Sequence, residues 1–132
     1  MTNESINKKI LYLDTSSETA VLAIFDGNAK LVEEKWEAGR ELSKTLTKKY
    51  LDTLSKAGFG QNDLAGVCVF IGPGSFTGLR IGISFANGLA FGMEIPIYET
   101  RTMGKINLAE PRELALPFYG AEPKITVPKE KK

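Results

Sequence analysis

The sequence GPGSFTGLRIG, residues 72–82, follows a short apolar run from Val67 to Phe70 and leads into a helix-like stretch. A strand that turns at glycines into a helix leaves backbone N–H groups unpaired at the helix start, where they can hold an anion or a polar group of a partner. Gly72 and Gly74 flank Pro73, so the turn is sharp and its backbone can be approached closely. The same pattern is typical of a plain tight turn between two core elements, and the residues alone leave both interpretations open.

Hydrophobic patterns on either side of this junction predict an α/β fold with the element order β-β-β-α-β-α-β. Strands are expected at residues 9–15, 19–25, 29–36, 65–71 and 95–98, and helices at residues 41–56 and 76–91. The tripeptide Asp26-Gly27-Asn28 is a hairpin signal between the second and third strands. Gly58 and Gly92 are expected to end the two helices.

Composition predicts one globular domain in a reducing cytoplasm. The chain has 132 residues, of which 42% are hydrophobic, and its 17 basic and 16 acidic residues give a net charge of +1. That balance argues against a strongly basic nucleic-acid binder, and no apolar run is long enough for a membrane span or a signal-peptide core. The single cysteine, Cys68, has apolar neighbours, so we expect a buried and inert thiol.

The chain contains no histidine, which excludes Ser-His and Cys-His nucleophile pairs and His-containing zinc sites. One enzymatic alternative is a small metal-dependent nuclease or hydrolase on an RNase-H-like scaffold, with Asp14 at the end of the first strand as a metal ligand. Such a site needs two or more converging carboxylates. Asp26 in a hairpin turn and Asp63 before a strand are poorly placed to converge with Asp14.

The run GPGSFTGLRIG, together with ILYLDTSS at residues 10–17 and the stretch from Ile83 to Pro96, resembles the TsaB (YeaZ) family of tRNA threonylcarbamoyladenosine biosynthesis. The resemblance covers roughly residues 9–103 and implies an RNase-H-like lobe of the actin/Hsp70/sugar-kinase (ASKHA) superfamily. Residues 1–103 are then the N-terminal lobe and residues 104–132 a C-terminal tail, partly extended or disordered, in a minimal form without the second lobe. The lysine-rich end of that tail is either solvated or a contact for RNA.

The resemblance implies a non-catalytic scaffold that binds a TsaD-like catalytic subunit, with a TsaE-like ATPase and tRNA joining through the complex. ATP or ADP and metal are then expected on the partner subunits, and none on the isolated chain, because the second nucleotide-binding lobe is absent. The residues that match a phosphate loop are expected to be vestigial. They are Asp14, Thr15, Ser16, Gly72, Gly74 and Ser75.

The family joins its subunits through helices that correspond here to residues 41–56 and 76–91, and the same helices are expected to form a homodimer when the chain is alone. The expected interface residues are Leu42, Leu46, Tyr50, Leu54, Thr77, Gly78, Arg80, Ile81, Gly82, Phe85, Ala86 and Leu89. Small residues spaced by four on the second helix suggest a face that a partner backbone approaches, although packing on the chain's own sheet accounts for part of it. Arg80 is expected to fold back toward the 72–77 turn or to reach an acidic partner group, the alternative being exposure to solvent.

Overall fold

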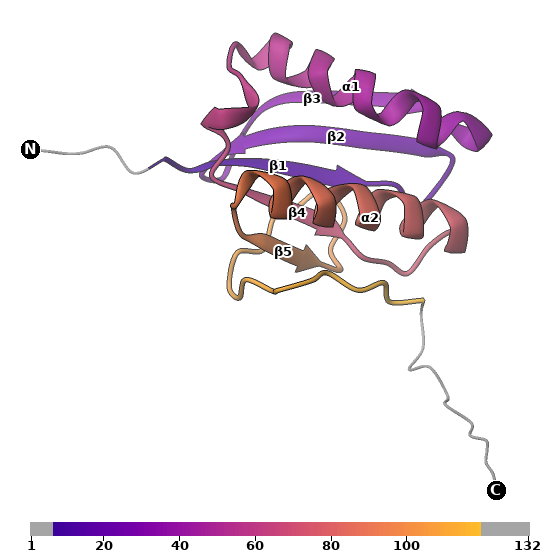
Figure 1. Ribbon diagram of the computed structural model, residues 1–132. Coiled ribbons are helices and arrows are strands. Elements are labelled where there is room, and N and C mark those ends of the chain that lie inside the picture. The colour runs from indigo at the N-terminus through magenta and orange to yellow at the C-terminus, as the bar shows by residue number, and fades with distance from the viewer. Residues whose placement is uncertain (1–6, 120–132) are drawn as a thin grey trace, which may run out of the picture.

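The computed structural model describes residues 7–119, which form one five-stranded sheet covered on one face by two α-helices (Figure 1). The elements in chain order are β1 (Lys9–Asp14), β2 (Thr19–Asp26), β3 (Ala29–Glu37), α1 (Leu42–Ala57), β4 (Gly66–Phe70), α2 (Phe76–Met93) and β5 (Ile97–Thr100). Short 3-10 turns, Gly39–Glu41 and Gln61–Asp63, precede α1 and β4. The predicted order of strands and helices is therefore confirmed.

The strands lie in the order β3-β2-β1-β4-β5. Strands β2 and β3 pair antiparallel, as the Asp26-Gly27-Asn28 signal predicts, and Gly27 takes the left-handed conformation in the turn between them. Strand β1 also pairs antiparallel with β2. Strands β1, β4 and β5 are parallel to one another, so their carboxyl ends meet at one edge of the sheet. In open sheets of this kind, ligands bind at that edge.

The core lies between the sheet and the helices, with α1 over β2 and β3 and α2 over β1 and β4. Trp36 identifies the helix-facing side of the sheet, because its indole N–H donates to Thr45 of α1 at 3.0 Å. Strand alternation and register place Leu13 and Leu22 on the same side, and both are completely buried. Burial of this apolar face supplies most of the driving force for folding.

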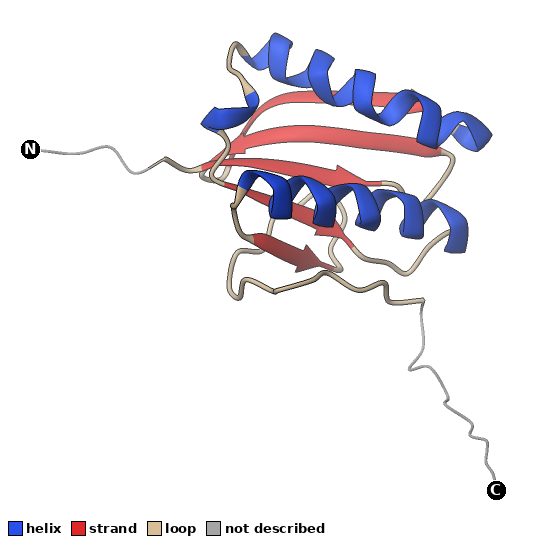
Figure 2. Cartoon of the chain, viewed as in Figure 1, coloured by secondary structure: helices blue, strands red, loops and turns tan. Residues whose placement is uncertain are grey.

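The other face of the sheet is covered in part by the chain that follows β5, which Figure 2 shows as a tan loop. The backbone N–H of Gly104 donates to the Tyr12 hydroxyl at 2.8 Å, and the Cys68 thiol contacts the Asn107 carbonyl oxygen at 3.9 Å. Cys68 is fully buried, and burial raises the pKa of its thiol to about 11. The thiol is thus protonated near neutral pH, which confirms the expectation of an inert cysteine.

Residues 104–119, expected as the start of a tail, are extended but packed against the rest of the lobe. Arg112 forms a β-bridge with Ile97, and the Asn87 side chain binds both the N–H and the carbonyl oxygen of Ala115. The backbone N–H of Phe118 donates to the Ile71 carbonyl oxygen at 2.7 Å. This stretch forms no helix, because its residues instead bond to β5, α2 and the turn after β4. The rest of the expected tail, residues 120–132, lies outside the described residues.

Helix α1 ends at Gly58 in a left-handed cap, as predicted. Helix α2 continues through Gly92, and Glu94 (φ 57°) forms the left-handed cap instead. The predicted end at Gly92 is therefore wrong by two residues, because the cap bonds to the Ala90 and Phe91 carbonyls come from Glu94.

Glu34 of β3 joins the sheet to α1 and should make stability depend on pH. Its carboxylate contacts Lys56 at 2.5 Å and Lys49 at 3.6 Å, and the hydrogen bond from Lys56 is the main cause that holds the pKa of Glu34 below its ordinary value. A lowered folded-state pKa stabilises the fold above the unfolded-state pKa, and that contribution is lost as the pH falls through the folded-state pKa.

We therefore expect Glu34→Gln to lower the free energy of unfolding by about 0.5–1 kcal/mol near neutral pH. The difference from the wild-type chain should disappear once the pH falls below the folded-state pKa of Glu34, which urea denaturation at a series of pH values measures. The control is Glu33→Gln, because Glu33 has one exposed partner, Lys30, and its change should be smaller. A wild-type advantage over Glu34→Gln that is unchanged in acid would contradict the assignment.

Candidate functional site

The loop after β1 and the turn before α2 meet at the carboxyl edge of the sheet. The Thr15 hydroxyl donates to the Gly78 carbonyl oxygen at 2.7 Å, and the Ser75 N–H donates to the Ser16 carbonyl oxygen at 2.7 Å. Asp14, Thr15 and Ser16 are all buried. The residues predicted as a vestigial phosphate loop therefore do come together in space.

The polar groups of this loop pair with one another. One carboxylate oxygen of Asp14 accepts hydrogen bonds from the Ser16 N–H at 2.9 Å and the Ser16 hydroxyl at 2.7 Å. Ser75 is the N-cap of α2, and its hydroxyl accepts from the Gly78 N–H at 3.2 Å. The Ser16 donors are of the kind that would hold a phosphate, but here they bond to Asp14, while the Ser75 hydroxyl accepts at the start of α2. Between the two interpretations left open by the sequence, the bonding favours the structural turn.

The small-residue face of α2 packs on the chain's own β1 loop, so the expectation that a partner approaches Gly78, Gly82 and Ala86 is wrong. A Cβ atom at Gly82 would lie 2.0 Å from the Thr15 hydroxyl oxygen, and one at Gly78 would lie 2.3 Å from the Thr15 carbonyl oxygen. Ala86 is completely buried. The glycines are needed because the helix backbone passes directly over Thr15.

The predicted interface residues of α1 are also buried within the chain. These residues are Leu42, Leu46, Tyr50 and Leu54, each exposed by 4% or less. The Tyr50 hydroxyl is 3.1 Å from Gln61, its ring meets the Phe85 ring edge-on, and burial raises the pKa of Tyr50 to about 12. The expectation that a lone lobe exposes these side chains is wrong, because α1 turns them onto β2 and β3.

A different face of α2 remains at the surface, and we call it the α2 stripe. It consists of Thr77, Ile81, Ser84, Phe85, Gly88 and Leu89, which are exposed or half-buried. Of the predicted interface residues, the stripe retains Thr77, Ile81, Phe85 and Leu89. Ser84 and Gly88 were missed, although helical spacing from Thr77 and Ile81 places them on the same arc.

Arg80 lies beside the α2 stripe, between two surface hollows of about 440 Å³ and 450 Å³. Its guanidinium folds back over the Phe76 ring at 5.2 Å, and Phe76 in turn stacks on Tyr119 with 4.7 Å between ring centroids. The side chain turns toward the residues before it, but Arg80 remains exposed to solvent, which was the alternative interpretation. The contact that its guanidinium makes in the 72–77 turn is with the aromatic ring of Phe76.

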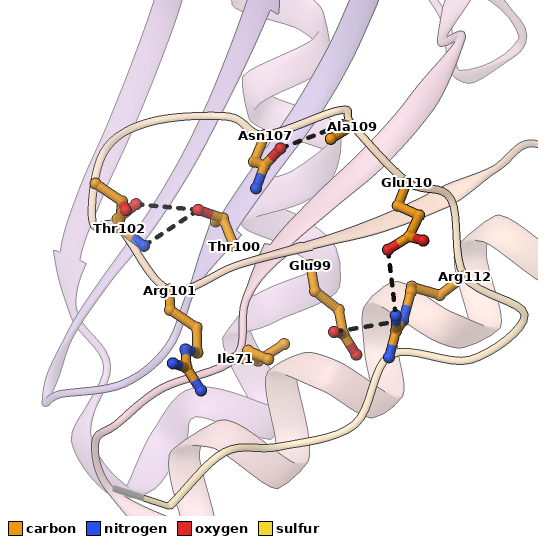
Figure 3. A pocket seen from close by; sticks show the side chains of 9 residues that line it. All are labelled: Ile71, Glu99, Thr100, Arg101, Thr102, Asn107, Ala109, Glu110 and Arg112. Atoms are coloured by element: carbon orange, nitrogen blue, oxygen red, sulfur yellow. Dashed lines mark hydrogen bonds and ion pairs between the residues drawn. The ribbon is translucent and has the colours of Figure 1, made fainter.

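A polar pocket of about 440 Å³ lies at the carboxyl ends of β4 and β5 (Figure 3). Arg112 contacts Glu99 at 3.5 Å and Glu110 at 3.8 Å, while the Arg101 guanidinium stacks on the Phe118 ring at 3.8 Å. None of the predicted site residues lines this pocket. Sequence reasoning missed it because its walls include residues 101–112, which have no periodic pattern.

Residues 7–119 contain neither a candidate metal site nor a candidate membrane-spanning helix. No group of three or more His, Cys, Asp or Glu side chains in this part of the chain is placed to hold a metal ion. No helix in the same residues is long and apolar enough to cross a membrane.

Comparison with known proteins finds similarity in sequence and in structure. The family model of TsaD, tRNA N6-adenosine threonylcarbamoyltransferase, matches residues 36–116. The tRNA threonylcarbamoyladenosine biosynthesis protein TsaB of Haemophilus influenzae is 36% identical over 95 residues, which are 69% of this chain and 38% of that protein. The tRNA N6-adenosine threonylcarbamoyltransferase of Nitratidesulfovibrio vulgaris is 32% identical over 114 residues, 85% of this chain and 30% of that enzyme.

The solved structure of YeaZ from Pseudomonas aeruginosa is also similar, with a TM-score of 0.65 and 31% identity over 70% of this chain and 43% of that one. This likeness confirms the predicted ASKHA-type α/β lobe. The chain spans about two-fifths of the TsaB relative's length. The match to the TsaD model runs past Met103, where the sequence pattern had suggested that the resemblance ends.

The two sides of α2 should respond oppositely to an added methyl group. Gly82→Ala should destabilise the fold by about 1–3 kcal/mol, because its Cβ overlaps Thr15. Gly88→Ala should stabilise it by about 0.5–1 kcal/mol, because nothing lies within 4 Å of its Cβ and alanine favours the helix. Chemical denaturation of both variants measures the effects, and equal changes would contradict the packing described.

Proposed function

Because the chain belongs to the TsaB (YeaZ) family, we propose that it is a non-catalytic subunit of tRNA threonylcarbamoyladenosine biosynthesis that binds a TsaD-like catalytic subunit. In this role a TsaE-like ATPase and tRNA join through the complex, and ATP or ADP and metal are held by the partner subunits. The chain contributes a folded surface that positions the catalytic subunit.

The α2 stripe is the observation that carries the proposal. Across its 18 residues, α2 has a single charged side chain, Arg80, although one face of the helix is at the surface. Half-buried Ile81, Phe85 and Leu89 alternate there with small exposed residues. Surfaces of this kind mark protein contacts. At Gly88 nothing lies within 4 Å of a Cβ position, so a partner helix can approach closely.

The positions of the carboxylates favour a scaffold over the nuclease alternative. Asp14 is at the carboxyl end of β1, whereas Asp26 pairs with Lys9 at the other end of that strand. Asp63 is exposed, and its carboxylate accepts a hydrogen bond from the Gly60 N–H. A metal-dependent nuclease needs such groups to converge on one ion, and these three lie apart.

When the catalytic subunit is absent, the α2 stripe is free to pair with a second copy of the chain. A two-fold arrangement places the same helix face on both sides of the interface. The homodimer and the heterodimer then use one surface, so the catalytic subunit should displace the second copy.

We expect Ser84→Arg and Gly88→Arg to abolish capture of a TsaD-like subunit from native cell extract, because either side chain blocks the α2 stripe. The matched control is Asn28→Arg, which adds the same charge in the β2–β3 turn and should leave capture unchanged. Mass spectrometry identifies the captured subunit, and light scattering of the purified chain should show the same two variants shifted toward monomer. Full capture by both stripe variants would contradict the proposed surface, and no TsaD-like subunit on the wild-type chain would contradict the function.

A further inference from the structure

Among the described residues, no acidic side chain lies beside the charge of Arg80. Arg80 makes no hydrogen bond or ion pair within residues 7–119. Its guanidinium lies over the Phe76 ring in a cation–π contact. The hollow on one side is lined by Thr77, Ile81 and Ser84 in addition to Arg80. The hollow on the other side is lined by residues of α2 and of the 114–119 segment, again without an acidic side chain.

The guanidinium is held in place by an aromatic stack that joins two distant segments. Phe76 begins α2 and Tyr119 ends the described chain, yet their rings lie 4.7 Å apart. Phe76 and Tyr119 remain 55% and 44% exposed. Because the Arg80 guanidinium lies over the Phe76 ring of this pair, less of its conformational freedom is left to lose on binding.

Contact at the α2 stripe would take this charge out of water. An unpaired cation at a protein interface carries a large desolvation cost, whereas a hydrogen-bonded carboxylate offsets it and sets the orientation of the two chains. We propose that the protein partner presents an aspartate or glutamate to Arg80, and that the Phe76–Tyr119 stack positions the guanidinium to receive it. This inference rests on the proposed function and adds the chemistry that the partner must supply.

The surroundings favour a protein carboxylate over an RNA phosphate. The 114–119 side of Arg80 carries Leu114 and Leu116, which are 55% and 56% exposed, and no further cation lines either hollow. Recognition of a nucleic-acid backbone uses several cations along a path. One cation among apolar side chains suits one acidic residue in an otherwise apolar protein surface.

The test is the affinity of the full chain for its purified TsaD-like subunit, measured by calorimetry from about 50 mM to about 500 mM salt. Arg80→Gln should weaken binding about 10- to 100-fold and should remove most of its salt dependence. Arg80→Lys keeps the charge but loses the flat stacking face, so it should fall between Arg80→Gln and the wild-type chain. Tyr119→Ala should weaken binding less than Arg80→Gln and leave the salt dependence in place.

Arg40→Gln is the matched control, because it removes an equal charge from an exposed position before α1 and should leave affinity unchanged. Arg80→Gln binding with wild-type affinity and salt dependence would overturn the carboxylate contact while leaving the proposed function intact. Loss of affinity for tRNA with no loss for the protein would assign Arg80 to a phosphate and would also overturn it. No complex with the wild-type chain would overturn the proposed function and this inference together.

Discussion

The close passage of α2 over Thr15 is the contact on which the rest of the structure depends. The Thr15 hydroxyl enters the first turn of the helix, and Gly78 and Gly82 leave the space that this requires. The contact sets the rotation of α2 about its axis. With its smallest residues turned inward, the helix directs Ile81, Ser84 and Phe85 outward, so a packing constraint inside the lobe determines which face of α2 stays at the surface.

The same close packing explains why the loop after β1, which has the residues of a phosphate site, already has its polar groups hydrogen-bonded within the chain. Ser16 and Ser75 bond to each other across the junction, and Asp14 accepts from the backbone and hydroxyl of Ser16. A phosphate would have to compete with bonds that already satisfy these groups. Loop chemistry that binds a ligand in one member of a fold class can thus support a helix in another, and function has to be argued from the site.

Much of the fold could be predicted from the sequence because local patterns report local structure. The Asp26-Gly27-Asn28 turn, the buried run at Val67 and the glycines after β4 all predict elements that the structure contains. Spacing of small residues correctly indicated close packing against α2, but it carries no information on whether the neighbour belongs to the same chain. The four apolar positions of α1 had the same ambiguity. Residues 104–119 could not be placed, because they are held by hydrogen bonds to residues that are distant in the sequence.

The hydrogen bond between Gly104 and Tyr12 joins residues 92 positions apart, and a backbone hydrogen bond joins Phe118 to Ile71. During synthesis, β1, β2 and β3 leave the ribosome with one face of the sheet and the outer edge of β1 uncovered. That edge is paired only after β4 has emerged, and Tyr12 meets its partner only after β5 has done so. Folding of this lobe is therefore completed only after β5 and the segment that follows it have emerged. Until then the nascent chain exposes apolar strands to solvent and to chaperones.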